Sequence, residues 1–218
     1  MRIQWYGQSA FDLAGRVFID PFGDVSLLAS RGLEFDYPAI EGVAAELVLV
    51  THEHRDHNGV EAISGSPAVI RSTAGTLESP VGEVVAVASE HDEVAGTKRG
   101  PNTIFVFTLD DLRIAHFGDF GQTALRDEQA DAIGQVDLAF VPVGGGPTIG
   151  AAQARELVDT IGARWVVPMH YRTPRISFLE TADAFLELYG DAVVQCDAPS
   201  FDTAELPEGP VVVVPAAP

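Results

Sequence analysis

The sequence predicts a layered α/β fold, in which two β-sheets pack together and helices cover their outer faces. Three observations support this prediction. The first 20 residues contain short apolar stretches separated by glycine turns, as in a series of β-strands. Residues Leu47–Val50 form a continuous apolar run, which is typical of a strand buried on both faces. In the second half of the chain, apolar strands alternate with stretches of helical spacing such as Ala151–Ile161.

The same patterns place the individual elements. Strands are expected at Arg2–Tyr6, Ala10–Leu13, Val17–Asp20, Leu47–Val50, Ala68–Arg71, Val84–Val87, Asn102–Leu109, Leu112–Phe117, Asp137–Val143, Trp165–Pro168, Ala192–Gln195 and Val211–Val214. Asp110 and Asp111 separate two of these strands and indicate a hairpin turn. Helices are expected at Asn58–Ile63, Leu125–Ile133, Ala151–Ile161 and Ala182–Leu188. No repeat, low-complexity tract or proline- and serine-rich linker interrupts the pattern, so residues 1–218 are expected to form a single domain.

Charge and composition limit the partners of the chain. It has 13 basic and 32 acidic residues, for a net charge of −19. Such an acidic surface repels phosphate backbones and disfavours nucleic acid as a partner, although bound divalent metal ions would reverse the charge of a cleft. No apolar run is long enough to span a bilayer and the N-terminal segment lacks a signal peptide pattern, so a cytoplasmic protein without membrane contact is expected. The single cysteine, Cys196, excludes an intramolecular disulfide and a cysteine-rich zinc site.

A cluster of candidate metal ligands follows the apolar run at Leu47–Val50. His52, His54, Asp56 and His57 occupy six positions there. Residues two apart on a strand share a face, so the first three side chains would begin on the same side. Neutral imidazoles and a carboxylate are ligands that Zn²⁺ and similar ions prefer. The alternative is a solvated polar loop, but such a loop need not follow a buried strand.

Further residues of the types that bind metal ions occur downstream, each at or near the end of an expected strand. They are His91, His116, Asp119 and His170. A carboxylate at Asp119 could bridge two ions about 4 Å apart, the spacing of two-metal sites. Taken singly, His91 or His170 would more often be an ordinary core or surface histidine, and Asp119 would more often be a turn residue.

These residues resemble the ligand pattern of the metallo-β-lactamase superfamily. Its signature His-x-His-x-Asp-His is matched by His52–His57, and its later histidine, Gly-Asp pair and last histidine are matched in order by His91, Gly118-Asp119 and His170. Other segments look like the branch that contains ascorbate-6-phosphate lactonase: Trp5–Phe11, Phe18–Pro21, Arg99–Thr103, His116–Asp119 and Pro142–Pro147. The resemblance covers roughly Met1 to Thr173.

The resemblance implies a four-layer αββα sandwich with two metal ions at one edge between the sheets. It assigns His52, His54 and His91 to one ion, Asp56, His57 and His170 to the other, and Asp119 to a bridge between them. His116 falls outside this pattern and is expected to be a core or supporting histidine. Zn²⁺ is the favoured ion, with Mn²⁺, Fe²⁺ and Ni²⁺ as alternatives that imidazole and carboxylate also suit.

The expected activity is hydrolysis by a metal-bridged hydroxide, on a small ester, lactone or phosphoester. Asp56 would bind a metal ion and orient the hydroxide, while Asp119 or a metal-bound water would protonate the leaving group. Arg99, Tyr171 and Arg172 lie near ligands in the sequence and are candidates for substrate contact. A rim salt bridge for the arginines and simple packing for Tyr171 are equally open.

Three other functions remain as alternatives. An iron redox enzyme on the same fold is disfavoured, because the flavodiiron members usually have Glu at the position of His54. A phosphodiesterase or nuclease is disfavoured by the acidic charge and by the absence of a basic arm. A non-catalytic metal-binding sensor is disfavoured because all seven expected ligands are present. The expected partner is a small-molecule substrate, and assembly into a homo-oligomer is left open.

Overall fold

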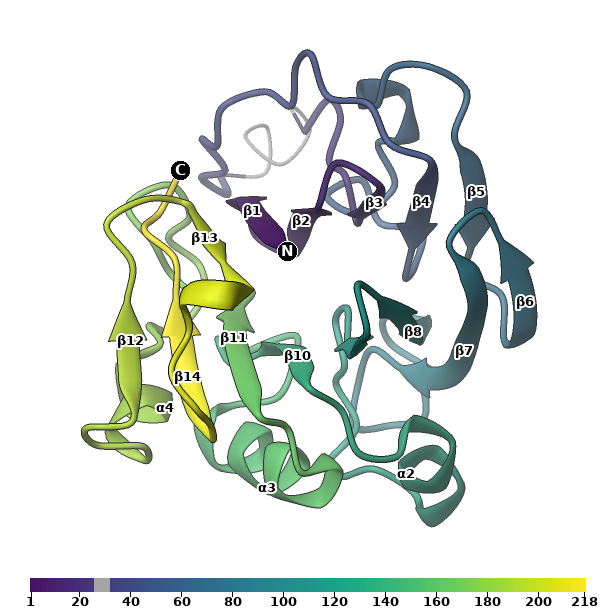
Figure 1. Cartoon of the computed structure of the whole chain (residues 1–218). Coiled ribbons are helices and arrows are strands. Elements are labelled where there is room, and N and C mark those ends of the chain that lie inside the picture. The colour runs from purple at the N-terminus through teal and green to yellow at the C-terminus, as the bar shows by residue number, and fades with distance from the viewer. Residues whose placement is uncertain (26–31) are drawn as a thin grey trace.

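The computed structural model describes residues 1–25 and 32–218, which form two facing β-sheets with helices outside (Figure 1). The six-stranded sheet has the spatial order β13 (Ser200–Asp202), β1 (Arg2–Gly7), β2 (Ala10–Leu13), β3 (Val17–Ile19), β4 (Leu47–Val50) and β5 (Ala68–Arg71). The eight-stranded sheet has the order β12 (Val193–Gln195), β14 (Val211–Val214), β11 (Trp165–Met169), β10 (Leu138–Pro142), β9 (Leu112–His116), β8 (Pro101–Leu109), β7 (Gly82–Glu90) and β6 (Gly75–Ser79). The predicted layered α/β class is therefore confirmed.

Strand β4 shows why its sequence is continuously apolar. All four of its residues are fully buried, but they belong to two different cores. Leu47 and Leu49 pack between the sheets, whereas Val48 and Val50 pack on the outer face of the six-stranded sheet. Side chains that alternate along a strand thus contribute to both layers.

The two outer layers differ. Helices α2 (Asp127–Ile133), α3 (Ala151–Ile161) and α4 (Asp183–Glu187) lie on the side of the eight-stranded sheet that faces away from the other sheet (Figure 1). Helix α3 buries Ala154, Leu157, Val158 and Ile161, which recur at helical spacing. The outer face of the six-stranded sheet is covered, in the described residues, by irregular chain that carries Tyr37 and Ile40 and by the 3₁₀ turn η1 (Val60–Ala62).

The sequence prediction differs from the structure at a few elements. The helix expected at Asn58–Ile63 is only the turn η1, because Gly59 lies directly against the backbone of Gly23, where a Cβ would approach within 2.2 Å, and the chain turns there. Strands β6 and β13 were not predicted. Strand β6 has a single large apolar residue, Leu77, and β13 is only three residues long, so neither carries a clear alternating pattern.

The topology brings several strand ends to one edge of the molecule. Strands β3, β4 and β5 run parallel in one sheet, and β9, β10, β11 and β14 run parallel in the other. The loops that follow β4, β9 and β11 meet at this edge, where the Thr103 N–H donates to the Thr51 carbonyl across the two sheets at 2.9 Å. Loops at the carboxyl ends of parallel strands are the usual place for a binding site in α/β proteins. No helix in the described part of the chain has the length and apolarity required to cross a bilayer.

Candidate metal centre

The loop after β4 is held in shape by a buried carboxylate, Asp20. Asp20 Oδ1 accepts from the Thr51 N–H at 2.8 Å, and Oδ2 accepts from the Thr51 hydroxyl at 2.7 Å. The same Oδ2 lies 2.9 Å from His57 Nδ1 and accepts its proton. Asp20 therefore fixes both the beginning and the end of the histidine-rich loop, and it turns His57 Nε2 toward the cluster.

Asp119 lies at the centre of the cluster. Its Oδ2 is 3.0 Å from His91 Nε2, 3.2 Å from His170 Nε2 and 3.8 Å from His52 Nε2, and its Oδ1 is 3.3 Å from His57 Nε2. These four histidines come from three different loops. The structure thus brings one carboxylate into contact with residues from both sheets.

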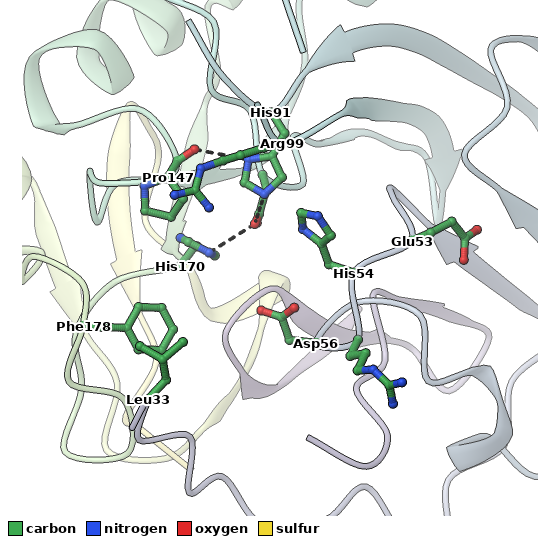
Figure 2. A pocket seen from close by; sticks show the side chains of 11 residues that line it. Leu33, Glu53, His54, Asp56, His91, Arg99, Pro147, His170 and Phe178 are labelled. Carbon is green, nitrogen blue, oxygen red and sulfur yellow. Dashed lines mark hydrogen bonds and ion pairs between the residues drawn. The ribbon is translucent and has the colours of Figure 1, made fainter. Parts of the chain in front are cut away.

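His54 and Asp56 complete the group of seven. His54 Nδ1 is 3.0 Å from His52 Nε2, and Asp56 Oδ2 is 3.7 Å from His57 Nε2. Figure 2 shows His54, Asp56, His91 and His170 around one space, with Glu53 directed away from it. Glu53 instead forms an ion pair with Arg71 at 2.6 Å.

The ring nitrogens that face away from the cluster have oxygen partners. His91 Nδ1 donates to the Pro147 carbonyl at 3.2 Å, and His52 Nδ1 lies 3.0 Å from the Thr51 hydroxyl oxygen. His170 Nδ1 lies 3.5 Å from the Thr148 hydroxyl. Such partners favour the tautomer in which the other nitrogen, Nε2, offers a lone pair to the centre of the site.

Two buried atoms test whether the site suits a metal ion. His57 Nε2 and Asp119 Oδ1 have no hydrogen-bond partner among the described residues. They face each other at 3.3 Å, and when His57 is neutral and donates from Nδ1 to Asp20, both facing atoms are acceptors. A cation between two such buried acceptors would satisfy both of them. Donor atoms within 4.8 Å of one another form two groups, His52 with His54 and His91, and His52 with His57 and Asp119.

The directions in which the site shifts the pKa values of its residues agree with a site that suits a metal ion. Burial lowers the pKa of His52 well below its usual value, helped by the neighbouring His57, and burial also lowers the pKa of His54. Although burial raises the pKa of Asp119, the adjacent His170, His57 and His91 hold it well below the usual range. Burial lowers the pKa of His57, but Asp119, Asp56 and Asp20 raise it well above normal. The site therefore disfavours a proton on His52 and His54, keeps Asp119 ionised and favours positive charge at His57, which a bound cation would supply in place of a proton.

The turn that presents Asp119 depends on Gly118 and Asn102. Gly118 has φ +55°, and a Cβ there would lie 2.5 Å from Asn102 Oδ1 and 2.6 Å from Thr51 Oγ1. Asn102 Oδ1 accepts from the Asp119 N–H at 3.0 Å, while its Nδ2 donates to the Phe117 carbonyl at 2.9 Å. Only glycine allows this close approach, and Asn102 holds the backbone on both sides of it.

Sequence reasoning assigned no role to Asp20 or Asn102. Both occur in short segments that resemble the superfamily, Phe18–Pro21 and Arg99–Thr103. Both are polar residues next to buried strands, and both are fully or almost fully buried in the structure. The sequence did contain one signal for their roles: a polar residue beside a buried strand is itself carried into the interior, where it needs hydrogen-bond partners.

His116 lies outside the cluster. Its Nε2 donates to the Ser9 carbonyl at 3.0 Å, and its Nδ1 accepts from the Gly118 N–H at 3.2 Å. Burial lowers the pKa of His116 to about 4, so this ring is neutral in the folded protein. The ring supports the turn that carries Asp119.

A cavity of about 390 Å³ opens over the cluster and is called the site cavity below. It is lined by Leu33, Glu53, His54, Arg55, Asp56, His91, Arg99, Asp119, Pro147, His170 and Phe178. Of the three residues considered for substrate contact, Arg99 is in this lining. The ring of Tyr171 is buried and stacks on Trp5 with centroids 5.7 Å apart, and Arg172 Nε donates to the Leu179 carbonyl at 2.6 Å.

Comparison with known proteins identifies the family. A family model described as the beta-lactamase superfamily domain matches residues 2–170. The chain belongs to this superfamily. Among curated relatives, a UPF0173 metal-dependent hydrolase of Thermococcus onnurineus is 30% identical, with 88% of this chain and 93% of the relative covered. A UPF0173 protein of Pyrococcus abyssi is 31% identical, with 79% and 84% covered.

A solved structure of a member of the same superfamily has a similar fold. The protein from Thermotoga maritima, assigned to the Zn-dependent hydrolases of the metallo-beta-lactamase superfamily, superimposes with a TM-score of 0.76. It is 29% identical, and the match covers 98% of this chain and 97% of that one. The chain is thus a metal-dependent hydrolase of the superfamily, as its sequence led us to expect.

Proposed function

We propose that the protein hydrolyses a small ester, lactone or phosphoester with two divalent metal ions, Zn²⁺ being the favoured one. His52, His54 and His91 would hold one ion, Asp56, His57 and His170 the other, and Asp119 would bridge them. One observation carries this proposal: His57 Nε2 and Asp119 Oδ1 face each other, buried and without hydrogen-bond partners in residues 1–25 and 32–218, at the point where five imidazoles converge. When bound, two such ions supply Lewis acidity and a water that is ionised near neutral pH.

Different residues of the chain would have different roles in this reaction. Asp56 lines the site cavity with a side chain that is 17% exposed, so its carboxylate can accept a hydrogen bond from the attacking water and orient it. Asp20 keeps His57 turned inward through its Nδ1 contact. Asp119 is held ionised by three histidines, which makes it a poor proton donor. Water in the open cavity is therefore our preferred source of the leaving-group proton over Asp119.

A cavity of this size and the net charge of −19 favour a small molecule over a nucleic acid strand. The first test is elemental analysis of the purified protein, followed by a screen of lactones, phosphodiesters and thioesters before and after chelation. We expect two equivalents of metal per chain and hydrolysis that is lost on chelation and restored by the ion. A protein that binds no divalent ion from any of the four candidates would refute the proposal. Full metal loading without turnover on any of these substrates would favour a sensor.

A further inference from the structure

Basic side chains without partners are concentrated at the site cavity. In residues 1–25 and 32–218, most basic side chains bond to a carboxylate, an amide, a carbonyl or an aromatic ring. The exceptions in these residues are Arg55, Lys98 and Arg99, whose side-chain nitrogens have no such contact. In a chain with a net charge of −19, carboxylates are abundant, so an unpaired cation needs a reason other than lack of partners.

The three exceptions share one location. Arg55 and Arg99 line the site cavity, and Lys98 lines a smaller cavity that also contains Arg99 and Pro147. Figure 2 shows Arg99 in the part of the wall that contains His91 and Pro147. The acidic residues of the site cavity are occupied otherwise, since Asp56 and Asp119 belong to the metal cluster and Glu53 pairs with Arg71.

Hydrogen bonds hold the loop that carries Arg99 in a fixed shape beside His91, a candidate metal ligand. Asp92, which follows His91, accepts four backbone N–H bonds: Oδ1 from Val94 at 3.0 Å and Gly96 at 2.8 Å, and Oδ2 from Lys98 at 2.9 Å and Arg99 at 2.8 Å. The backbone of Arg99 is therefore fixed relative to His91 before a substrate binds, which reduces the entropy cost of substrate binding.

Another part of the cavity wall is apolar. Phe178 is 36% exposed, which is unusual for a phenylalanine, and it lines the cavity together with Leu33. Figure 2 shows these two side chains in a region of the wall separate from Arg99. An exposed aromatic ring beside a polar centre offers contact area to an organic group.

We propose that the site cavity selects substrates with a second negative group, a carboxylate or phosphate that is distinct from the bond being hydrolysed. Arg99 binds this group, and Leu33 and Phe178 contact the apolar part of the substrate. This inference rests on the proposed hydrolytic function and narrows its substrate class to small anionic esters, lactones or phosphoesters. The guanidinium is suited to the task because its fork of N–H donors matches both carboxylate and phosphate.

The direct test is anion binding to the metal-loaded protein, measured by titration calorimetry. Acetate is compared with malonate, succinate and glutarate, in which a second carboxylate is added at increasing distance. The best dicarboxylate is expected to bind about five- to tenfold more tightly than acetate. Arg99→Ala removes this gain, Arg99→Lys restores part of it, and Asp92→Asn gives an intermediate loss because the loop is no longer held by all four bonds.

The matched control is Arg2→Ala, which removes one positive charge from an exposed residue outside the site cavity. It is expected to leave the dicarboxylate gain unchanged. A gain that persists in Arg99→Ala, or that falls equally in Arg2→Ala, would overturn the inference, as would a wild-type protein with no gain. Far-UV circular dichroism of each variant checks that the fold is intact.

A second measurement separates this inference from the proposed function. Hydrolysis of neutral 4-nitrophenyl acetate is compared with that of the anionic mono-4-nitrophenyl succinate. A preference for the anionic ester that depends on Arg99 supports both proposals. Hydrolysis of both esters without preference refutes the inference alone. Absence of metal binding refutes the proposed function, on which the inference depends.

Discussion

The two sheets contribute to the metal cluster in different ways. The six-stranded sheet supplies four candidate ligands from one loop, His52–His57, directly after β4. The eight-stranded sheet supplies three, His91, Asp119 and His170, from separate loops after β7, β9 and β11. The first set is visible in six consecutive letters of sequence, whereas the second set exists only once the strands have been placed side by side.

The support behind the two sets differs as well. The His52–His57 loop depends on one carboxylate, Asp20, which bonds to its beginning and its end. Asp119 depends on a tight backbone turn at Gly118 and on the amide of Asn102. Substitutions that affect the His52–His57 loop and substitutions that affect the Asp119 turn should therefore have different effects on metal binding and stability, as predicted below.

The largest effect is expected where the two sets meet. Asp119→Ala removes the carboxylate that contacts histidines from both sheets, and His52→Ala removes a residue of both donor groups. Each variant should lose most of its bound metal and all hydrolytic activity. Asp159→Ala on the surface of α3 serves as the control. Normal metal stoichiometry in both variants would contradict the assignment of the cluster.

A backbone change at the Asp119 turn should come next. In Gly118→Ala the added Cβ meets Asn102 and Thr51, so the turn must shift and unfolding free energy should fall by at least about 3 kcal/mol. Gly162→Ala is a matched control, because Gly162 is also left-handed, with φ +58°, but among the described residues its added Cβ would meet only the Gln135 side chain, at an ordinary 3.6 Å. It should cost only about 1–2 kcal/mol. Equal losses in denaturant unfolding of the two variants would show that crowding at Gly118 is unimportant.

A smaller effect is expected from Asp20→Asn. The amide cannot accept the three hydrogen bonds that Asp20 accepts, so His57 loses the partner that orients its ring. Loss of such a partner typically weakens metal binding about 10- to 100-fold. Competition with a chromogenic chelator measures the affinity. An unchanged affinity would mean that the His52–His57 loop holds its shape without Asp20.

The smallest effect on metal is expected at His116. Since the nitrogens of this ring bond to Ser9 and Gly118 and do not face the cluster, His116→Ala should keep the metal content of the wild type. Loss of one equivalent per chain would show that His116 is a ligand.

His116 should also contribute to the pH dependence of stability. Its folded pKa of about 4 lies below the ordinary 6.5, so between these values the unfolded chain binds a proton that the folded chain does not. Its stabilising effect is complete above pH 6.5 and is lost as the pH falls toward 4, by up to about 3 kcal/mol. Unfolding free energies of the metal-free protein from pH 7.5 to 5 should fall less steeply in His116→Gln than in the wild type. Parallel curves would contradict this.

The contrast between the two sheets also explains what could be predicted from the sequence. The core strands have strong apolar patterns, and β4 is apolar throughout because both of its faces are buried. The His52–His57 loop could be recognised from spacing alone. The assignment of His91, Asp119 and His170 needed the family resemblance, because their separation along the chain does not show that they meet.

Other features depend on contacts that no local pattern contains. Asp20 bonds to residues 31 and 37 positions away, and Asn102 bonds to an amide 17 positions away. Both residue types are common in loops, so only the fold shows their roles. The short strand β13 is defined by pairing with β1 at the far end of the chain, and three residues carry too little alternation to predict that pairing.

Because the cluster draws on both sheets, bound ions would act as a cross-link between them. Opening of the sandwich at this edge would require the ions to dissociate, and an ion at 100 times its dissociation constant would stabilise the closed form by about 2.7 kcal/mol. The Thr103 amide, which bonds to Thr51 across the edge, would then exchange with solvent deuterium at a rate that depends on free metal concentration. The same ions that supply the chemistry would thus keep the two halves of the protein from separating.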